Sequence, residues 1–186
     1  MIEGCWMTEK NIISECRKGN RSAFKELYEL LSPPMMIICR RYMGGSPFLK
    51  DVFQEAFIKI YSSLDRFEYR GEGSLTAWAG KIMVTTSLKS LRSIDWKTIS
   101  TEEVGDIPEE EEVEIRDVPG DKILEFIMEL PDGYRTVMNL YVFESKTHKE
   151  IAGLLGISPM TSASQLSRAR QLLTKKIKQY ESEIDG

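Results

Sequence analysis

The sequence predicts an all-α protein in which two small helical domains are joined by an acidic, flexible linker. On both sides of the centre, apolar residues recur at the three- and four-residue spacing of amphipathic helices, and almost no segment alternates as a half-buried strand does. The centre itself, residues 100–121, contains two prolines, two glycines and four consecutive glutamates, without a helical period. A solvated surface loop within one domain is the alternative interpretation of this segment.

In the N-terminal part, the apolar spacing predicts a helix over residues 23–31, after a cap within Asn20–Ser22. Ser32-Pro33-Pro34 is expected to end this helix, because proline lacks the N–H group that a helix interior uses. A second helix is expected over residues 35–43, up to the glycine pair 44–45.

Two further helices complete this part, over residues 48–64 and 74–92. The first is expected to bury one apolar face, formed by Val52, Phe53, Ala56, Phe57, Ile60 and Leu64. On the second, the apolar positions include Leu75, Trp78, Ile82 and Leu88.

Beyond the linker, helices are expected over residues 122–130, before Pro131, and over residues 133–143. Thr147 opens a short helix that Gly156 can end in the left-handed conformation.

A second helix of this pair is expected from Pro159 to Gln179, with Ser158 as its N-cap. A helix, a three-residue turn and a basic helix form a helix-turn-helix, whose second helix enters the major groove of DNA. A plain helical hairpin with a solvated basic face is the alternative. The expected core residues here are Ile151, Leu154, Leu155, Ile157, Leu166 and Leu173.

The helix pair offers candidate DNA contacts. The start of its second helix carries small hydrogen-bonding side chains suited to base edges and phosphates: Thr161, Ser162, Ser164, Gln165 and Ser167. Arg168, Arg170 and Lys175 follow and can reach the phosphate backbone. On the first helix, beside Lys149, His148 can bond a phosphate or serve as a partly exposed structural histidine.

The formal net charge of −4 conceals an uneven distribution. Residues 1–95 carry 14 basic and 11 acidic side chains, whereas residues 96–122 carry 3 and 10. Residues 158–180 contain five basic side chains and no acidic one. Such segregation is compatible with nucleic-acid binding by an acidic protein.

The composition excludes several classes of protein. The longest apolar run, residues 35–39, is far shorter than the ~20 residues of a membrane span, and the N-terminus lacks the features of a secretory signal. Three cysteines without a CxxC pair fit a reducing cytoplasm, and one histidine is too few for a His-rich metal site or a Ser-His-Asp hydrolase. We therefore expect a cytoplasmic protein without membrane insertion, cofactor, metal site, small-molecule substrate or enzymatic activity.

Two surfaces of the N-terminal part are candidate binding sites. Ile58 lies among polar residues on the helix face opposite the apolar one, and an apolar anchor with a polar rim suits a protein–protein contact. Further on, aromatic and cationic residues are interleaved: Arg66, Phe67, Tyr69, Arg70, Trp78 and Lys81. Such a mixture can stack on unpaired bases and contact phosphates. Core packing of Phe67 and Trp78 is the alternative.

Almost the whole chain resembles a bacterial sigma factor of the extracytoplasmic-function (ECF) type, in the sigma-70 family, and especially those of the Bacteroidetes. The matching segments, in order, are ECRKGNRSAFKELYELLSP, DVFQEAFIKIYSSLDRF, LPDGYRTVMNLYVFESKTHKEIAGLLGIS and SQLSRARQLLTKKI. The resemblance implies that residues 8–95 form sigma region 2, which binds core RNA polymerase and recognises and melts the promoter −10 element. It further implies an acidic linker over residues 96–121 and, over residues 122–183, a sigma region 4 that reads the −35 element.

Position by position, the resemblance assigns roles to residues of this chain. The contact with core polymerase falls to Asp51, Val52, Gln54, Glu55 and Ile58. The −10 DNA would be met by Arg66, Phe67, Tyr69, Arg70, Trp78, Lys81 and Thr85, and the −35 DNA by His148, Lys149, Thr161, Ser162, Ser164, Gln165, Ser167, Arg168 and Arg170. An anti-sigma factor is a further implied partner.

The linker is long enough for this arrangement. Its residues, about 26 in number, extend to roughly 86 Å at ~3.3 Å per residue. Two DNA elements roughly 17 base pairs apart are separated by about 58 Å at ~3.4 Å per pair.

The chain departs from the family pattern in two places. Thr85 stands where family members usually carry Asn, so the base preference at the −10 element is open. Residues 159–165 read Pro-Met-Thr-Ser-Ala-Ser-Gln where the family commonly shows Glu-Gly-Thr-Ser-Arg-Ser-Gln, so Met160 and Ala163 are the main differences. Ala163 lacks the guanidinium of a bidentate base contact, which is worth about 1–3 kcal/mol. Translation can start at Met1 or Met7, because the family-like segment begins after both.

Three other functions compete with the sigma factor. A free-standing helix-turn-helix regulator would bind duplex DNA as a dimer and without polymerase. A helical adaptor without DNA contact is disfavoured by the basic helix, and an enzyme by the lack of a converging nucleophile, base or metal set.

Overall fold

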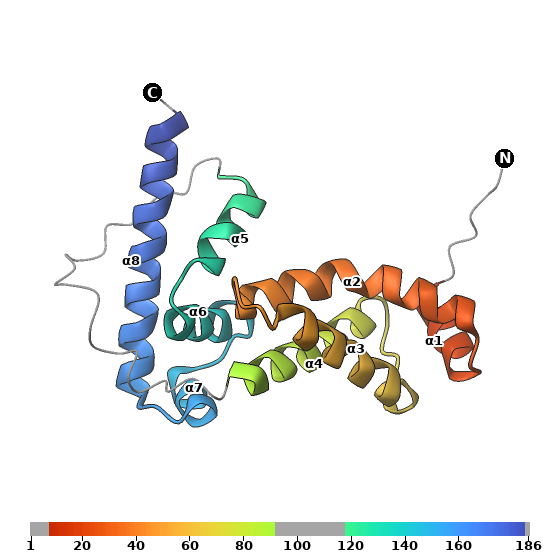
Figure 1. The fold of residues 1–186 in the computed structure, drawn as a ribbon. Helices are drawn as coiled ribbons and strands as arrows, with labels where there is room; N and C mark the ends of the chain where they lie inside the picture. Colours follow the sequence, from red (N-terminus) through yellow and green to blue (C-terminus); the bar gives the residue numbers. More distant parts are fainter. Residues whose placement is uncertain (1–7, 92–117, 185–186) are drawn as a thin grey trace. The chain divides into compact units, whose positions relative to one another are not determined.

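The computed structural model describes residues 8–91 and 118–184, and within them all regular secondary structure is helical (Figure 1). The prediction of an all-α fold is therefore confirmed. The helices are α1 (Glu9–Arg17), α2 (Arg21–Met43), α3 (Leu49–Ser63), η1 (Leu64–Arg66), α4 (Ser74–Ser90), α5 (Gly120–Met128), α6 (Asp132–Met138), η4 (Asn139–Phe143), α7 (His148–Leu155) and α8 (Pro159–Ile184). Most of the predicted linker, residues 96–117, and both candidate start residues lie outside the described residues.

The chain divides into two compact units. Within the described residues, the first unit comprises residues 8–39 and 47–90, and the second comprises residues 40–46, 91 and 118–184. Each unit has its own buried apolar residues.

Helix α2 differs from the prediction, because it runs through Pro33 and Pro34 without a break. The two expected helices, 23–31 and 35–43, are therefore one. Proline inside a helix costs a hydrogen bond and is sterically unfavourable. The compensation is a fully buried stripe on one face of α2, formed by Ala23, Leu27, Leu31, Met35, Cys39 and Tyr42. Only a continuous helix keeps this stripe in register, and its burial outweighs the two missing N–H groups.

The first unit also contains a helix, α1, that was not predicted from the sequence. Helix α1 buries Ile12, Ile13 and Cys16, and the Thr8 side chain caps its first turn by accepting from the Asn11 N–H. At the start of α2, the predicted cap is confirmed, since the Asn20 side chain accepts from the Ser22 N–H at 3.0 Å.

Helices α3 and α4 pack against each other. All six residues expected on the apolar face of the first are buried: Val52, Phe53, Ala56, Phe57, Ile60 and Leu64. On α4, the apolar positions Trp78, Ile82 and Leu88 are only half-buried. The buried stripe consists instead of Leu75, Ala79 and Met83, extended by the small Ser87. Helix α4 therefore has two overlapping apolar faces. The face that packs inward is the one with the smaller side chains, Ala79 and Ser87 among them.

The second unit confirms the helix-turn-helix. Thr147 and Glu150 form a reciprocal capping box at the start of α7, and hydrogen bonds from Thr147 hold the pKa of Glu150 below its usual value. Gly156 ends α7 in the left-handed conformation at φ 68°. Ser158 then caps α8, its Oγ accepting from the Thr161 N–H at 2.9 Å.

Fewer of the core residues expected in the helix pair are buried than predicted. Ile151 and Leu166 are buried, but Leu155, Ile157 and Leu173 are half-exposed and Leu154 is 50% exposed. The assignment of Leu154 to the core was therefore wrong, because α7 is short and turns only Ile151 and Ala152 fully inward.

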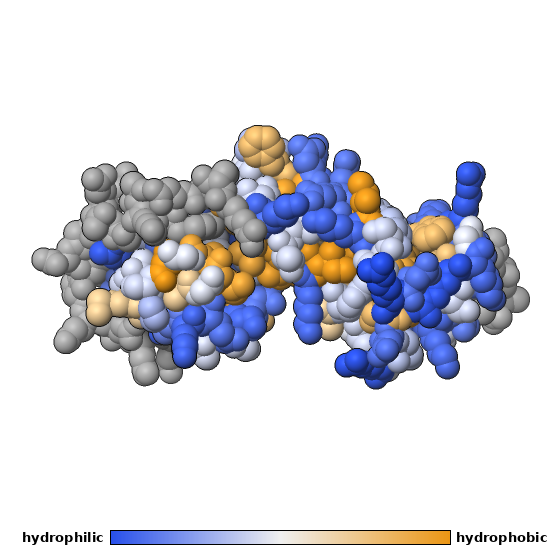
Figure 2. All heavy atoms as spheres, turned by 90° about the horizontal axis from the view of Figure 1, so that it is seen from below, coloured by the Kyte–Doolittle hydropathy of each residue, from blue (hydrophilic) through white to orange (hydrophobic). Residues whose placement is uncertain are grey.

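Apolar side chains also reach the surface at several places, as the orange areas on the face in Figure 2 show. Across the described residues, the large exposed hydrophobic side chains are Tyr28, Leu30, Ile37, Phe48, Ile58, Tyr69, Val142, Phe143, Leu154, Met160 and Ile184. Among those same residues, no helix has the combination of length and hydropathy that crossing a membrane requires.

Candidate nucleic-acid interface

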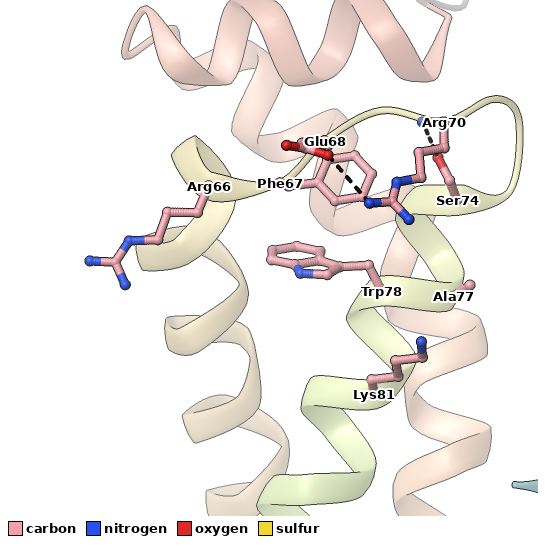
Figure 3. A pocket seen from close by; sticks show the side chains of 8 residues that line it. All are labelled: Arg66, Phe67, Glu68, Arg70, Ser74, Ala77, Trp78 and Lys81. Atoms are coloured by element: carbon pink, nitrogen blue, oxygen red, sulfur yellow. Dashed lines mark hydrogen bonds and ion pairs between the residues drawn. The ribbon is translucent and has the colours of Figure 1, made fainter.

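A cavity of about 520 Å³ opens on the first unit, between the segment that follows α3 and the first turns of α4 (Figure 3). Its lining combines aromatic and charged side chains: Arg66, Phe67, Glu68, Arg70, Ser74, Ala77, Trp78 and Lys81. A volume of this order accommodates a molecule with the dimensions of a nucleobase and its sugar.

The aromatic wall consists of Phe67 and Trp78. Their ring centroids lie 5.0 Å apart and the ring planes are tilted by 42°. Phe67 is only 6% exposed, whereas Trp78 is half-exposed and offers the surface of its indole beside the cavity (Figure 3). Phe67 therefore supports the wall, and Trp78 is the ring on which a base can stack.

Arg17 in α1 holds the segment that carries Phe67. Its guanidinium donates to the Leu64 carbonyl oxygen at 3.3 and 3.1 Å, and also to the Phe67 carbonyl oxygen. Leu64 and Phe67 follow Arg17 by 47 and 50 positions in the sequence. Arg17 was not predicted as part of this site, since no local pattern shows which carbonyl groups a distant arginine reaches.

The rim of the cavity is shaped by a turn before α4. Gly71 and Gly73 both have positive φ values, 119° and 80°, which favour glycine. The Ser74 hydroxyl donates to the Gly71 carbonyl at 2.6 Å and accepts from the Arg70 N–H at 3.2 Å. From α1, a Glu9 carboxylate oxygen accepts from the Gly73 N–H at 3.2 Å.

Charge at the cavity is predominantly positive. Arg66, Arg70 and Lys81 supply three cations against the single carboxylate of Glu68. Glu68 lies 3.3 Å from the Arg70 guanidinium, and both side chains are 80% exposed, so this ion pair is weak and can open. The site can thus meet phosphates while a base contacts its aromatic wall.

Five of the seven residues predicted for −10 DNA lie together in this lining: Arg66, Phe67, Arg70, Trp78 and Lys81. Tyr69 and Thr85 are exposed but do not line it. The Thr85 hydroxyl donates to the Lys81 carbonyl of its own helix at 2.7 Å. Glu68, Ser74 and Ala77 were missed, although Ser74 could have been noticed as the polar residue that follows a glycine turn.

A second candidate surface is the outer face of α3. Asp51, Gln54, Glu55 and Ile58 are exposed on it, and Ile58 is 67% exposed. Val52 is only 3% exposed, which contradicts its predicted role in a protein contact, because its side chain belongs to the apolar face that packs inward. The Lys59 ammonium bonds the Glu55 carboxylate at 2.7 Å and lowers the pKa of that group.

The third candidate surface is the helix pair α7–α8. Lys149, Ser164 and Arg170 are exposed, and His148, Thr161, Ser167 and Arg168 are half-exposed. Ser162 and Gln165 are 0% and 1% exposed, so their predicted contacts with DNA are contradicted. They occupy the inward face of α8, as their spacing of three residues from each other allows.

His148 has partners within the second unit. Its Nδ1 lies 3.0 Å from the Ser162 hydroxyl, and its ring stacks on Tyr141 with centroids 4.8 Å apart. These contacts support a structural role for His148.

Comparison with known proteins gives two family matches. Residues 27–97 match the model described as sigma-70 region 2, and residues 120–173 match the model described as sigma-70, region 4. The ECF RNA polymerase sigma factor SigW of Bacillus subtilis is 26% identical over 187 residues, covering 92% of this chain and 98% of that protein.

Other proteins are also similar to this chain. The ECF RNA polymerase sigma-E factor of Haemophilus influenzae is 26% identical, with coverage of 92% and 96% of the two chains. Among solved structures, that of CnrH in complex with the cytosolic domain of CnrY is similar, with a TM-score of 0.47, 19% identity, and coverage of 91% and 97%. The Bacteroidetes-like character expected above is tested by none of these matches.

The two family matches together cover about two thirds of the chain, in the order region 2 then region 4, and the curated relatives extend over nearly all of it. The chain therefore belongs to the sigma-70 family and is an ECF-type, alternative sigma factor that directs transcription initiation.

Proposed function

We propose that the first unit recognises and opens the promoter −10 element by holding an unpaired base in the cavity against Trp78. The observation that carries this proposal is the joint position of one half-exposed indole and three cations around a space of about 520 Å³. An unstacked base loses its neighbours in the duplex, and an aromatic side chain can replace them. Arg66, Arg70 and Lys81 would neutralise the flanking phosphates.

The outer face of α3 is proposed to bind core RNA polymerase. Ile58 would be the apolar anchor, and Asp51, Gln54 and Glu55 its polar rim. Val52 is a buried core residue of α3 and would support this face through packing, without touching the polymerase. The helix pair α7–α8 is proposed to bind the −35 element, with α8 in the major groove and Lys149, Arg168 and Arg170 toward the phosphates.

A chain of net charge −4 can act on DNA if a partner protein supplies positive charge. Core polymerase would supply most of the sequence-independent attraction to phosphates, and this chain would supply the specific contacts. An inhibitory anti-sigma protein, expected from the resemblance, is a proposed further partner.

The assembly is tested by co-elution of the full chain with sigma-free core RNA polymerase on a sizing column. We expect a stoichiometric complex, and we expect Gln54→Ala combined with Glu55→Ala to weaken it. Gln179→Ala combined with Glu183→Ala is the matched control, since that exposed pair lies on α8. Specific duplex binding by the chain alone, without a polymerase complex, would instead favour the dimeric helix-turn-helix regulator.

The base-stacking role of Trp78 is tested with the reconstituted holoenzyme, by the permanganate reactivity of unpaired thymines at the −10 element. Stacking is worth about 1–3 kcal/mol per base, so Trp78→Ala is expected to reduce opening about tenfold or more, while Trp78→Phe retains part of it. Phe48→Ala, which removes an aromatic ring that is 62% exposed and outside the cavity, should leave opening unchanged. Normal opening with Trp78→Ala would contradict the proposal.

A further inference from the structure

The exposed face of α8 near its N-terminus is unusually apolar for a helix that meets DNA. Met160 is 81% exposed, the highest value among the large exposed hydrophobic side chains of residues 8–91 and 118–184. Ala163 and Ser164, three and four residues later, are exposed on the same side of the helix. The opposite side, with Ser162 and Gln165, is buried.

The hydroxyl groups near Met160 have hydrogen-bond partners in α8 or in its cap. The Ser164 hydroxyl donates to the Thr161 carbonyl at 3.0 Å, and the Thr161 hydroxyl lies 2.9 Å from that of Ser158. A hydroxyl that donates its one proton to the local backbone has only acceptor capacity left for a ligand. On the first turns of α8, the exposed side therefore combines the Met160 thioether and the Ala163 methyl group with few hydroxyl protons left to donate.

The basic and amide side chains of α8 do not add hydrogen-bond donors to the exposed side of its first turns. Arg168 is two turns beyond Met160, and its guanidinium lies 3.4 Å from the Tyr134 hydroxyl. Gln165 is the amide nearest to the helix start, and it is only 1% exposed. Guanine is read chiefly by arginine or lysine and adenine by asparagine or glutamine, so neither purine has its usual partner on these turns.

Thymine is the base that complements such a surface. In the major groove it alone presents an apolar group, the C5-methyl, and alanine and other apolar side chains contact that group. We propose that Met160, flanked by Ala163, contacts the C5-methyl group of thymine and makes the −35 element of this sigma factor thymine-dependent at the base pairs that face these side chains. The inference rests on the proposed placement of α8 at the −35 element and names the base that it reads.

Deoxyuridine provides a direct test, because it differs from thymidine in DNA only by the missing methyl group. The preferred −35 sequence is first selected from a promoter library randomised at that element, using holoenzyme reconstituted from the full chain and the core polymerase of the same bacterium. Each selected thymine is then replaced singly by deoxyuridine, and the affinity of the holoenzyme is measured at fixed salt.

At one or more positions we expect a loss of about fourfold, which corresponds to one buried methyl group at ~0.8 kcal/mol. In the Met160→Ala holoenzyme this loss should disappear, and Met160→Leu should retain it. Leu154→Ala is the matched control, because it truncates an apolar side chain that is 50% exposed on α7 and should leave the deoxyuridine effect intact.

Three results would overturn the inference. Selection of guanine at the positions facing α8, or no effect of deoxyuridine on the wild-type holoenzyme, would exclude a methyl contact. An equal effect in the wild-type and Met160→Ala holoenzymes would assign the contact to another residue. In these cases the proposed function stands, whereas failure to form a holoenzyme, or to initiate at any library member, overturns both.

Discussion

Arg17→Ala removes the side chain that ties α1 to the segment carrying Phe67. The guanidinium donates to two carbonyl oxygens, those of Leu64 and Phe67. Hydrogen bonds from a charged donor are worth about 1.5–3 kcal/mol, and water competes for this exposed side chain, so we expect the lower part of that range. For a domain of this size, ~2 kcal/mol corresponds to a fall in Tm of about 10 °C.

The functional effect should exceed what stability alone explains. A loosened Phe67 no longer supports Trp78, and part of the stacking energy of about 1–3 kcal/mol per base is lost. We therefore expect promoter opening to fall about tenfold at a temperature where the variant remains folded, with the affinity for core polymerase unchanged. The assays are thermal unfolding followed by circular dichroism and permanganate footprinting of the open complex.

Lys18→Ala is the matched control for this substitution. Lys18 is the next residue and pairs with Glu15 at 2.6 Å, within the exposed turn that ends α1. Arg17→Lys should recover part of the opening, since one ammonium group can reach one of the two carbonyls. If Arg17→Ala and Lys18→Ala lower Tm and opening equally, the positioning role of Arg17 is refuted.

Three further predictions concern the helix-turn-helix and the buried thiols. Thr147→Ala breaks the capping box of α7 and should lower the free energy of unfolding of the second unit by about 1 kcal/mol, measured by urea unfolding, with Thr174→Ala, a half-exposed position within α8, as the comparison. An unchanged free energy of unfolding would show that the cap does not stabilise this unit. Ala163→Arg adds a guanidinium to the exposed face of α8 and should shift −35 selection toward guanine, by about 1–3 kcal/mol of discrimination; an unchanged selection profile would argue against α8 as the reading helix. Burial raises the pKa of Cys16 and of Cys39 to about 11, so their contribution to stability is present below pH 9.0 and is lost as the pH rises through about 11. Iodoacetamide should therefore label both slowly at pH 8 in the folded chain and rapidly in urea, as measured by mass spectrometry, and equal rates in both states would contradict their burial.

The functional surfaces were predicted to different extents. Interleaved aromatic and cationic residues predicted a −10 site, and five of the seven predicted residues line one cavity, because most of them are close in the sequence. The contribution of Arg17 was not predictable, since it depends on α1 lying beside η1. Ser162 and Gln165 were placed at the DNA for a related reason: a residue type suited to binding does not reveal which way its helix faces. For Val52, the apolar spacing had already predicted the buried face, and only the family resemblance placed it at the polymerase contact.

The sequence by itself determined the features that depend on local chemistry. The helical class, the Ser158 cap, the left-handed Gly156 and the turn between α7 and α8 follow from periodicity and from backbone preferences within a few residues. Only the tertiary structure decided that α2 continues through Pro33 and Pro34, which face of α4 is buried, and that Ser162 points inward. These outcomes depend on the free energy of burying a helix face against its neighbours, which outweighs local preference and cannot be evaluated before the neighbours are known.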